Sequence, residues 1–482
     1  MKVQLEQGLT VEEPRLHVEI QTIPREEIGP RKLLSQAIQD RYRYPEGSLQ
    51  FSLDGPLSAR PGYFRFSGNT TCFGRSSRGV GQQATDASQF EVHCVPTNNG
   101  DLSLPFDPTE VVDNLRLERY AYGDGNSLSL QTALKTLYYT VRPLTTHSMR
   151  RCIQRFRARN WTRVSFPKWP VDTTVEDICG KLLLSAMEAK HVNKLPFVWF
   201  WPNGARGCLT MTHDVETEAG RSFCSELMNI DDAYGVKASF QIVPEGRYHV
   251  SQAFLASFRK RGFEIAVQDL NHDGRLFDDR QEFLRRAKKI NQYKEKFGAK
   301  GFRAAVLYRK PEWYGDFNFA YDMSIPNVAH LDPQSGGCCT VFPYFIGDMV
   351  ELPVTTVQDY MLFHILNEHS ISLWQSQIET ILGHNGLVSF IVHPDYVIET
   401  GPRKIYESLL AHIHELRAKT NLWCALPLDI ESWWRARSQM SVVKHGNRWQ
   451  IEGEHSHRAT LAFAKNANGK LVYELESAAA AV

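Results

Sequence analysis

The chain contains 482 residues, and its 55 lysines and arginines against 54 aspartates and glutamates leave a formal charge of +1. This near-neutral balance argues against a general nucleic-acid-binding surface and against a polybasic membrane surface. No apolar run approaches the roughly 18–20 residues that a membrane-spanning helix needs. Residues 1–24 show no secretory-signal pattern, and the nine cysteines include no C-x-x-C pair. We therefore expect a reduced, cytoplasmic protein without a membrane span.

Composition and patterning divide the chain into five parts. Residues 1–45 are a charged lead-in, and residues 46–130 contain short alternating runs punctuated by Gly, Pro, Asn and Ser, which predict a β-rich N-terminal domain. Residues 131–195 are predicted to form a helical connector. The main domain is expected over residues 196–436, followed by a small C-terminal β-appendage at 437–482.

Strand-like apolar runs alternate with helical patterns along the main domain. The strand-like runs are Cys208–Thr212, Ala238–Val243, Glu264–Val267, Gly301–Leu307, Val350–Val354, Leu387–Val392 and Leu422–Leu426. The helical segments are Arg221–Tyr234, Val250–Arg261, Asp279–Phe297, Tyr360–Glu368 and Arg403–Thr420. This alternation indicates parallel strands joined by crossover helices, and the number of repeats favours an α/β fold of the (β/α) barrel type.

Polar side chains stand at the ends of four of these runs, where a barrel enzyme carries its active site. Asp214 and Glu216 follow the first run, and His272 follows the third. Arg303 lies in the fourth, and His393 directly follows the run that ends at residue 392. Carboxylates, histidines and an arginine are the parts needed for metal-assisted hydrolysis, because they can hold a divalent ion and move protons.

In their order, these segments resemble the polysaccharide deacetylase family over roughly residues 199–434. The resemblance implies a distorted (β/α) barrel that removes acetyl groups from N-acetylated sugars with a divalent metal, commonly zinc. The family's first motif is a strand ending in Thr, an aromatic residue, Asp and a further Asp. It is similar to Thr212-His213-Asp214-Val215-Glu216. By this resemblance Asp214 is the general base and Glu216 a metal ligand.

The family's second motif, in which two histidines separated by three residues bind the metal, is similar to Gln268-Asp269-Leu270-Asn271-His272. His272 matches the second ligand. Gln268 stands at the first ligand position, where an amide oxygen is a poorer ligand for zinc than an imidazole.

Two further motifs supply the remaining candidates. The third, Arg-x-Pro followed by Tyr, is similar to Arg303-Ala304-Ala305-Val306, which keeps the arginine that orients the base and lacks the proline and tyrosine. The last, a strand ending in His, is similar to Ile391-Val392-His393 and implies that His393 is the general acid. Asp322 falls where the acid of the family's fourth motif lies, and it would tune His393.

Three functional hypotheses follow. The first is a metal-dependent hydrolase that removes N-acetyl groups from a saccharide, within polysaccharide biosynthesis. The second is a non-catalytic glycan-binding or scaffold protein that kept the deacetylase fold and lost a metal ligand at Gln268. The third is a glycosidase that uses Asp214 and Glu216; it is the weakest, because residues two apart on one strand lie only ~7 Å apart and do not straddle a bond. The sequence does not determine the oligomeric state.

Overall fold

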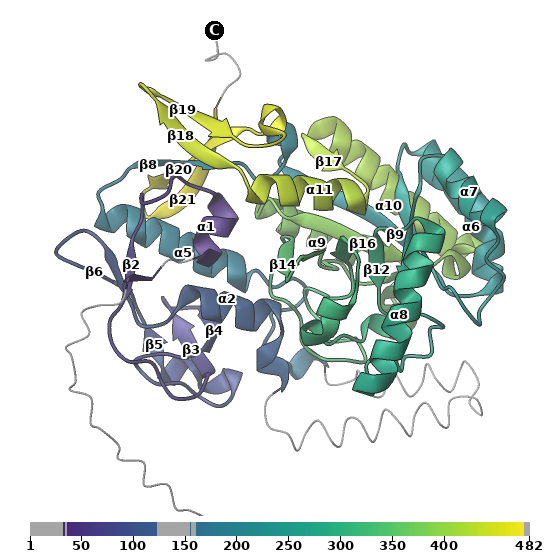
Figure 1. Ribbon diagram of the computed structural model, residues 1–482, viewed down its shortest axis with the longest axis horizontal. Helices are drawn as coiled ribbons and strands as arrows, with labels where there is room; N and C mark the ends of the chain where they lie inside the picture. The colour runs from purple at the N-terminus through teal and green to yellow at the C-terminus, as the bar shows by residue number, and fades with distance from the viewer. Residues whose placement is uncertain (1–31, 34–35, 123–154, 156–160, 477–482) are drawn as a thin grey trace, which may run out of the picture.

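The computed structural model describes residues 32–33, 36–122, 155 and 161–476 (Figure 1). The predicted lead-in at 1–45 and connector at 131–195 are therefore described only in part. None of the helices in these ranges is long and apolar enough to cross a membrane.

A nine-stranded sheet curls into a half-barrel at the centre of the chain (Figure 1). Eight of its strands run parallel, and β14 pairs antiparallel to β15 at one edge. In sheet order the strands are β14 (Tyr344–Ile346), β15 (Met349–Glu351), β13 (Tyr321–Asp322), β12 (Gly301–Arg303), β11 (Glu264–Gln268), β10 (Ala238–Ile242), β9 (Gly207–Val215) and β16 (Leu387–Val392), with β17 (Leu422–Cys424) also paired to β9. All nine residues of β9 are buried, as expected for a parallel strand covered on both faces.

Four helices match segments that the alternating pattern predicted: α6 (Glu218–Ala233), α7 (Gln252–Lys260), α8 (Arg280–Phe297) and α10 (Thr400–Lys419). Two more, α9 (Ser372–Gly383) before β16 and α11 (Pro427–Ser438) after β17, lie outside the predicted helical segments. Local sequence explains their limits. In α8 the Asp279 side chain accepts a hydrogen bond from the backbone N–H of Glu282, and the helix ends at Gly298 in a left-handed conformation (φ 59°).

Two predicted elements differ from the structure. The strand predicted for 301–307 ends at Arg303, because Val306 and Leu307 adopt positive φ values of 59° and 52° that an extended strand does not allow. A short 3-10 turn, Ala305–Leu307, takes its place. The helix predicted for 360–368 is a π-helical turn over Met361–Ile365.

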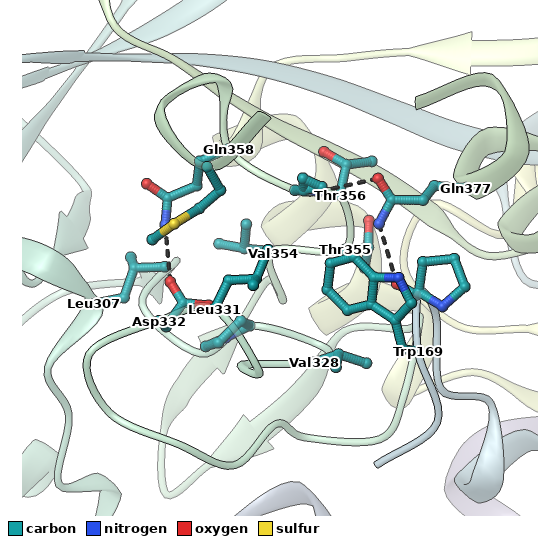
Figure 2. A pocket seen from close by; sticks show the side chains of 14 residues that line it. Trp169, Leu307, Val328, Leu331, Asp332, Val354, Thr355, Thr356, Gln358 and Gln377 are labelled. Carbon is teal, nitrogen blue, oxygen red and sulfur yellow. Dashed lines mark hydrogen bonds between the residues drawn. The ribbon is translucent and has the colours of Figure 1, made fainter. Parts of the chain in front are cut away.

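Threonine side chains join the segment after β15 to β16. Thr355 Oγ1 donates to the carbonyl of Leu387 (2.7 Å) and accepts from the backbone N–H of Ser389 (2.9 Å), and Thr356 Oγ1 donates to the carbonyl of Ser389 (2.8 Å). A cavity of about 20 Å³ lies beside this seam (Figure 2). In Figure 2 the Gln358 amide donates to Asp332 (3.1 Å) across it. A cavity of this size has room for about one water molecule.

In the residues that the structure describes, the N-terminal part packs against the half-barrel through smaller sheets and three helices. One sheet contains β1 (Lys32–Leu33), β2 (Phe51–Leu53), β7 (Leu102–Leu104) and β6 (Val95–Pro96). Another contains β4 (Thr70–Gly74), β3 (Gly62–Phe66) and β5 (Glu91–Val92). The helices are α1 (Gln36–Tyr42), α2 (Pro108–Arg116) and α5 (Thr174–Ala189).

The C-terminal strands are not separate from the rest of the chain. β18 (Ser441–His445) pairs with β19 (Arg448–Glu452), whereas β20 (Leu461–Ala467) lies between β21 (Lys470–Leu475) and β8 (Lys194–Val198). The boundary predicted at residue 196 therefore falls inside β8. A continuous apolar cluster extends from Ala37 in α1 through the central sheet to Ala464 in β20. The N-terminal, central and C-terminal parts thus share one hydrophobic core.

Candidate functional site

The carboxyl ends of four strands bring most of the predicted site residues together. Asp214 lies near the end of β9, Gln268 and Arg303 end β11 and β12, and His393 follows β16. Gln268 and Arg303 are partners in the parallel register, so they lie side by side at the same edge of the sheet. This is the edge at which parallel α/β sheets carry their ligands.

Asp214 is held by a buried arginine. Arg303 Nη1 donates to Asp214 Oδ1 (2.6 Å) and to Thr212 Oγ1 (2.9 Å), and its Nε donates to the carbonyl of Met323 (2.9 Å). Arg303 is fully buried, and only 3% of Asp214 is exposed. A charge-assisted hydrogen bond of this length fixes the orientation of the carboxylate.

Gln268 connects the two carboxylates of the first motif. Its amide Nε2 donates to Asp214 Oδ2 (3.1 Å) and to Glu216 Oε1 (3.1 Å). Carboxylates only accept hydrogen bonds, so the amide nitrogen and not its oxygen faces them. Gln268 Oε1 is buried and has no hydrogen-bond partner among the residues that the structure describes.

Two imidazoles lie next to Glu216. His272 Nε2 is 2.6 Å from Glu216 Oε1, and His393 Nε2 is 3.6 Å from the same oxygen. Burial alone would raise the pKa of Glu216, but the neighbouring imidazoles of His272 and His393 outweigh burial and hold that pKa well below its usual value. Glu216 is therefore an anion at neutral pH, with about a fifth of its side chain exposed.

His393 is oriented by Asp359. The backbone N–H of His393 donates to Asp359 Oδ2 (2.7 Å), and His393 Nδ1 lies 2.6 Å from Asp359 Oδ1. Burial alone would lower the pKa of His393, yet Asp359, with Glu216, raises it well above its usual value. The Nε2 atom is the ring nitrogen that remains for the site, which suits a proton donor.

The predicted tuning role of Asp322 needs correction. Its carboxylate accepts hydrogen bonds from the backbone N–H (3.0 Å) and Oγ (2.7 Å) of Ser324, one strand beyond Arg303. Its register partner on β15 is Glu351, and both are fully buried. Burial raises the pKa of both carboxyls, and the carboxylate of Asp322 raises that of Glu351 further. The acid that contacts His393 is Asp359, because the chain after β15 runs beside β16.

Sequence reasoning missed Asp359 and Arg247, although a signal for both was present. Each stands in a polar segment that follows a strand, the same signal that identified the other candidates. Arg247 lies in the loop after β10, and its Nη2 donates to the carbonyl of His272 (2.6 Å). The ring of Tyr396 also lies beside the site, with its centroid 4.9 Å from that of the His393 ring.

The donor atoms at this site fit a divalent cation. In the described part of the chain, one group of acidic and histidine side chains could share an ion: Asp214, Glu216 and His393 offer ligand atoms within 4.8 Å of one another. His272 Nε2 is buried, and its 2.6 Å contact with Glu216 is not aligned as a hydrogen bond. An imidazole nitrogen and a carboxylate oxygen placed in this way suit a common cation. Gln268 is the poorest ligand in this group, because its amide nitrogen, which cannot bind a cation, faces the carboxylates.

No protein-family model matches the chain, and no curated protein matches it significantly. Several solved structures similar to this chain are polysaccharide deacetylases.

Three of the similar structures show the range of sequence identity and TM-score. A Mycobacterium smegmatis structure assigned to a polysaccharide deacetylase is 19% identical, covering 52% of this chain and 98% of its own, with a TM-score of 0.42. A family 4 acetyl xylan esterase from Clostridium thermocellum, in complex with a cobalt ion, is 13% identical, covering 47% and 91% of the two chains, with a TM-score of 0.29. A Bacillus subtilis peptidoglycan deacetylase is 10% identical, covering 48% and 93%, with a TM-score of 0.32.

Proposed function

We propose that this protein is a hydrolase that removes an N-acetyl group from a saccharide, with Asp214 as the general base and His393 as the general acid. One observation carries the proposal. Two separate ion pairs, Arg303 with Asp214 and Asp359 with His393, orient an acid–base pair at the carboxyl ends of neighbouring strands. Catalytic acids and bases need this kind of oriented, buried partner.

The residues perform the reaction as follows. Asp214 takes the proton of the attacking water while Arg303 keeps its carboxylate in place. Asp359 stabilises the imidazolium form of His393 through Nδ1, and His393 Nε2 donates its proton to the departing nitrogen as the acetamide C–N bond breaks. The products are acetate and the free amino sugar. Positioned acid–base catalysis of this kind contributes roughly 10²- to 10⁴-fold to a rate.

A divalent cation completes the proposed site. Glu216 and His272 would hold it, with Gln268 after its amide turns, and zinc is the proposed ion. Such an ion, when bound, polarises the acyl carbonyl and lowers the pKa of water. Asp214 and His393 lie close enough to Glu216 to contribute ligand atoms as well.

The test is acetate release from N-acetylated oligosaccharides, measured for the purified full-length chain with and without added zinc. Asp214→Asn keeps the shape of the side chain and removes the base, so the rate should fall by about 10²- to 10⁴-fold. Asp348→Asn, at an exposed turn outside the site, is the matched control and should leave the rate unchanged. Equal rates for Asp214→Asn and the parent protein would sink the proposal.

A second candidate function is glycan binding without turnover. Both oxygens of Asp214 already accept hydrogen bonds, from Arg303 and from Gln268, which leaves the base less free to take a proton. Calorimetric titration with the same oligosaccharides separates the two functions. Binding without acetate release, unchanged in Asp214→Asn, would establish the second. The glycosidase hypothesis is not retained, because Asp214 and Glu216 leave the same end of β9 and share one donor from Gln268.

A further inference from the structure

Arg247 contacts His272 on the side of the ring away from Glu216. Its Nη2 donates to the backbone carbonyl of His272 (2.6 Å) and lies 3.3 Å from His272 Nδ1, and its Nε donates to the carbonyl of Asn271 (3.3 Å). His272 has a positive φ of 57°, which turns the backbone so that both carbonyls face the guanidinium. The same turn presents Nε2 to Glu216.

This contact favours one position for the hydrogen on the His272 ring, and the Glu216 carboxylate 2.6 Å from Nε2 favours the same position. A guanidinium has only donors, so Nδ1 must accept, and the hydrogen of the neutral imidazole then resides on Nε2. A metal-binding histidine needs the opposite arrangement. It offers a lone pair to the ion through one nitrogen and donates its other N–H to a carboxylate, carbonyl or water.

We propose that Arg247 weakens divalent-cation binding at this site by holding His272 in the tautomer whose Nε2 is protonated. The proposal rests on the cation site of the proposed function and assigns Arg247 as a positioning residue that acts through His272. A guanidinium next to a ligand also repels an incoming cation, in the same direction. The amide nitrogen that Gln268 presents to both carboxylates acts in this direction too.

The His272 turn has support that is independent of Arg247. Arg286 forms two hydrogen bonds with Asp273, at 2.8 and 2.9 Å, and the Asn271 side chain accepts from the backbone N–H of Asp273 (3.2 Å). Replacing Arg247 should therefore leave the turn in place. Arg247→Met keeps most of the length of the side chain and removes every donor, whereas Arg247→Lys keeps a charged donor.

The experiment measures Co²⁺ binding to chelator-treated protein from its visible absorption, using the parent chain, Arg247→Met and Arg247→Lys. Because changes next to a metal ligand alter affinity by about 10- to 100-fold, Arg247→Met should bind Co²⁺ tighter than the parent by that factor. Arg247→Lys should stay near the parent, and adding His272→Ala to Arg247→Met should abolish the gain. Circular dichroism shows whether each variant is folded.

The outcomes separate this inference from the proposed function. Equal Co²⁺ affinity in the parent and Arg247→Met, a gain of the same size in Arg247→Lys, or a gain that survives His272→Ala would each overturn the role of Arg247. None of these would affect acetate release by the parent chain. If Arg247→Met does not fold, the same titration of Arg247→Gln decides, since its side chain can accept from Nδ1 and should also tighten binding.

Discussion

Asp359 and His393 are joined at two points, through the backbone N–H and through Nδ1 of the histidine, although they lie 34 residues apart in the chain. The double contact holds both the position and the ring orientation of His393. It continues the seam in which Thr355 and Thr356 bind the backbone of β16. The segment after β15 therefore acts as a rigid support for the proposed general acid.

Asp359→Asn tests this support. The amide keeps the size of the side chain but no longer stabilises a charged imidazole, so proton donation by His393 should weaken. We expect kcat for acetate release to fall by about 10- to 100-fold with little change in KM. Steady-state kinetics check this, with Asp348→Asn as the exposed control. A change confined to KM would mean that Asp359 serves substrate binding instead.

The Arg303–Asp214 pair should also matter for stability. Arg303→Ala leaves the Asp214 carboxylate buried without its cation, and breaking a buried pair in this way costs about 3–5 kcal/mol. Urea unfolding measures the loss. Lys419→Ala, on an exposed part of α10, should have no measurable effect. Because Asp214→Asn removes the charge that Arg303 neutralises, the double variant should lose less than the sum of the two single variants.

A buried ion pair connects the N-terminal part to the half-barrel. The Glu118 carboxylate accepts from Arg309 and from the backbone N–H of Gly337, and Tyr120 donates to the Gly337 carbonyl (2.6 Å). Glu118→Met removes the carboxylate that pairs with the buried Arg309 guanidinium and should lower the unfolding free energy by about 3–5 kcal/mol. Adding Arg309→Met should recover part of that loss, since an apolar pair of similar volume can replace a buried ion pair, while the Gly337 N–H still lacks its carboxylate acceptor. A double variant as unstable as Glu118→Met would contradict this explanation.

Glu264 should make the stability depend on pH. Burial raises its pKa to about 7, although hydrogen bonds from Tyr321 Oη and the backbone N–H of Leu428 oppose the rise. The folded state then binds the proton more tightly than the unfolded state. This contribution is fully present below the ordinary pKa and is lost as the pH rises through about 7.

Glu264→Gln should flatten this dependence. Between pH 5 and 8 the parent chain should lose up to about 3 kcal/mol more unfolding free energy than the variant. Urea unfolding at both pH values measures the difference. Glu312→Gln, an exposed carboxyl, should behave like the parent. Parallel losses in the parent and Glu264→Gln would show that other groups cause the pH dependence.

Local patterns in the sequence predicted much of the central half-barrel. Apolar runs correspond to β9, β10, β11 and β16, because a strand buried on both faces is predominantly apolar. The polar residues after these strands then identified the candidate site, since parallel strands end at one edge. Short elements were harder: β13 has only two residues, Tyr321 and Asp322, too few for a periodic pattern.

The sequence by itself thus determined the α/β class and the set of strand-end residues, including Asp214, Gln268 and His393. Only the tertiary structure decided their partners. Asp359 rather than Asp322 meets His393, the Gln268 amide connects two carboxylates, and Glu118 reaches Arg309 across 191 residues. The physical reason is that periodicity reports which side of an element is buried, whereas a hydrogen-bond partner depends on where the folded chain brings distant segments together.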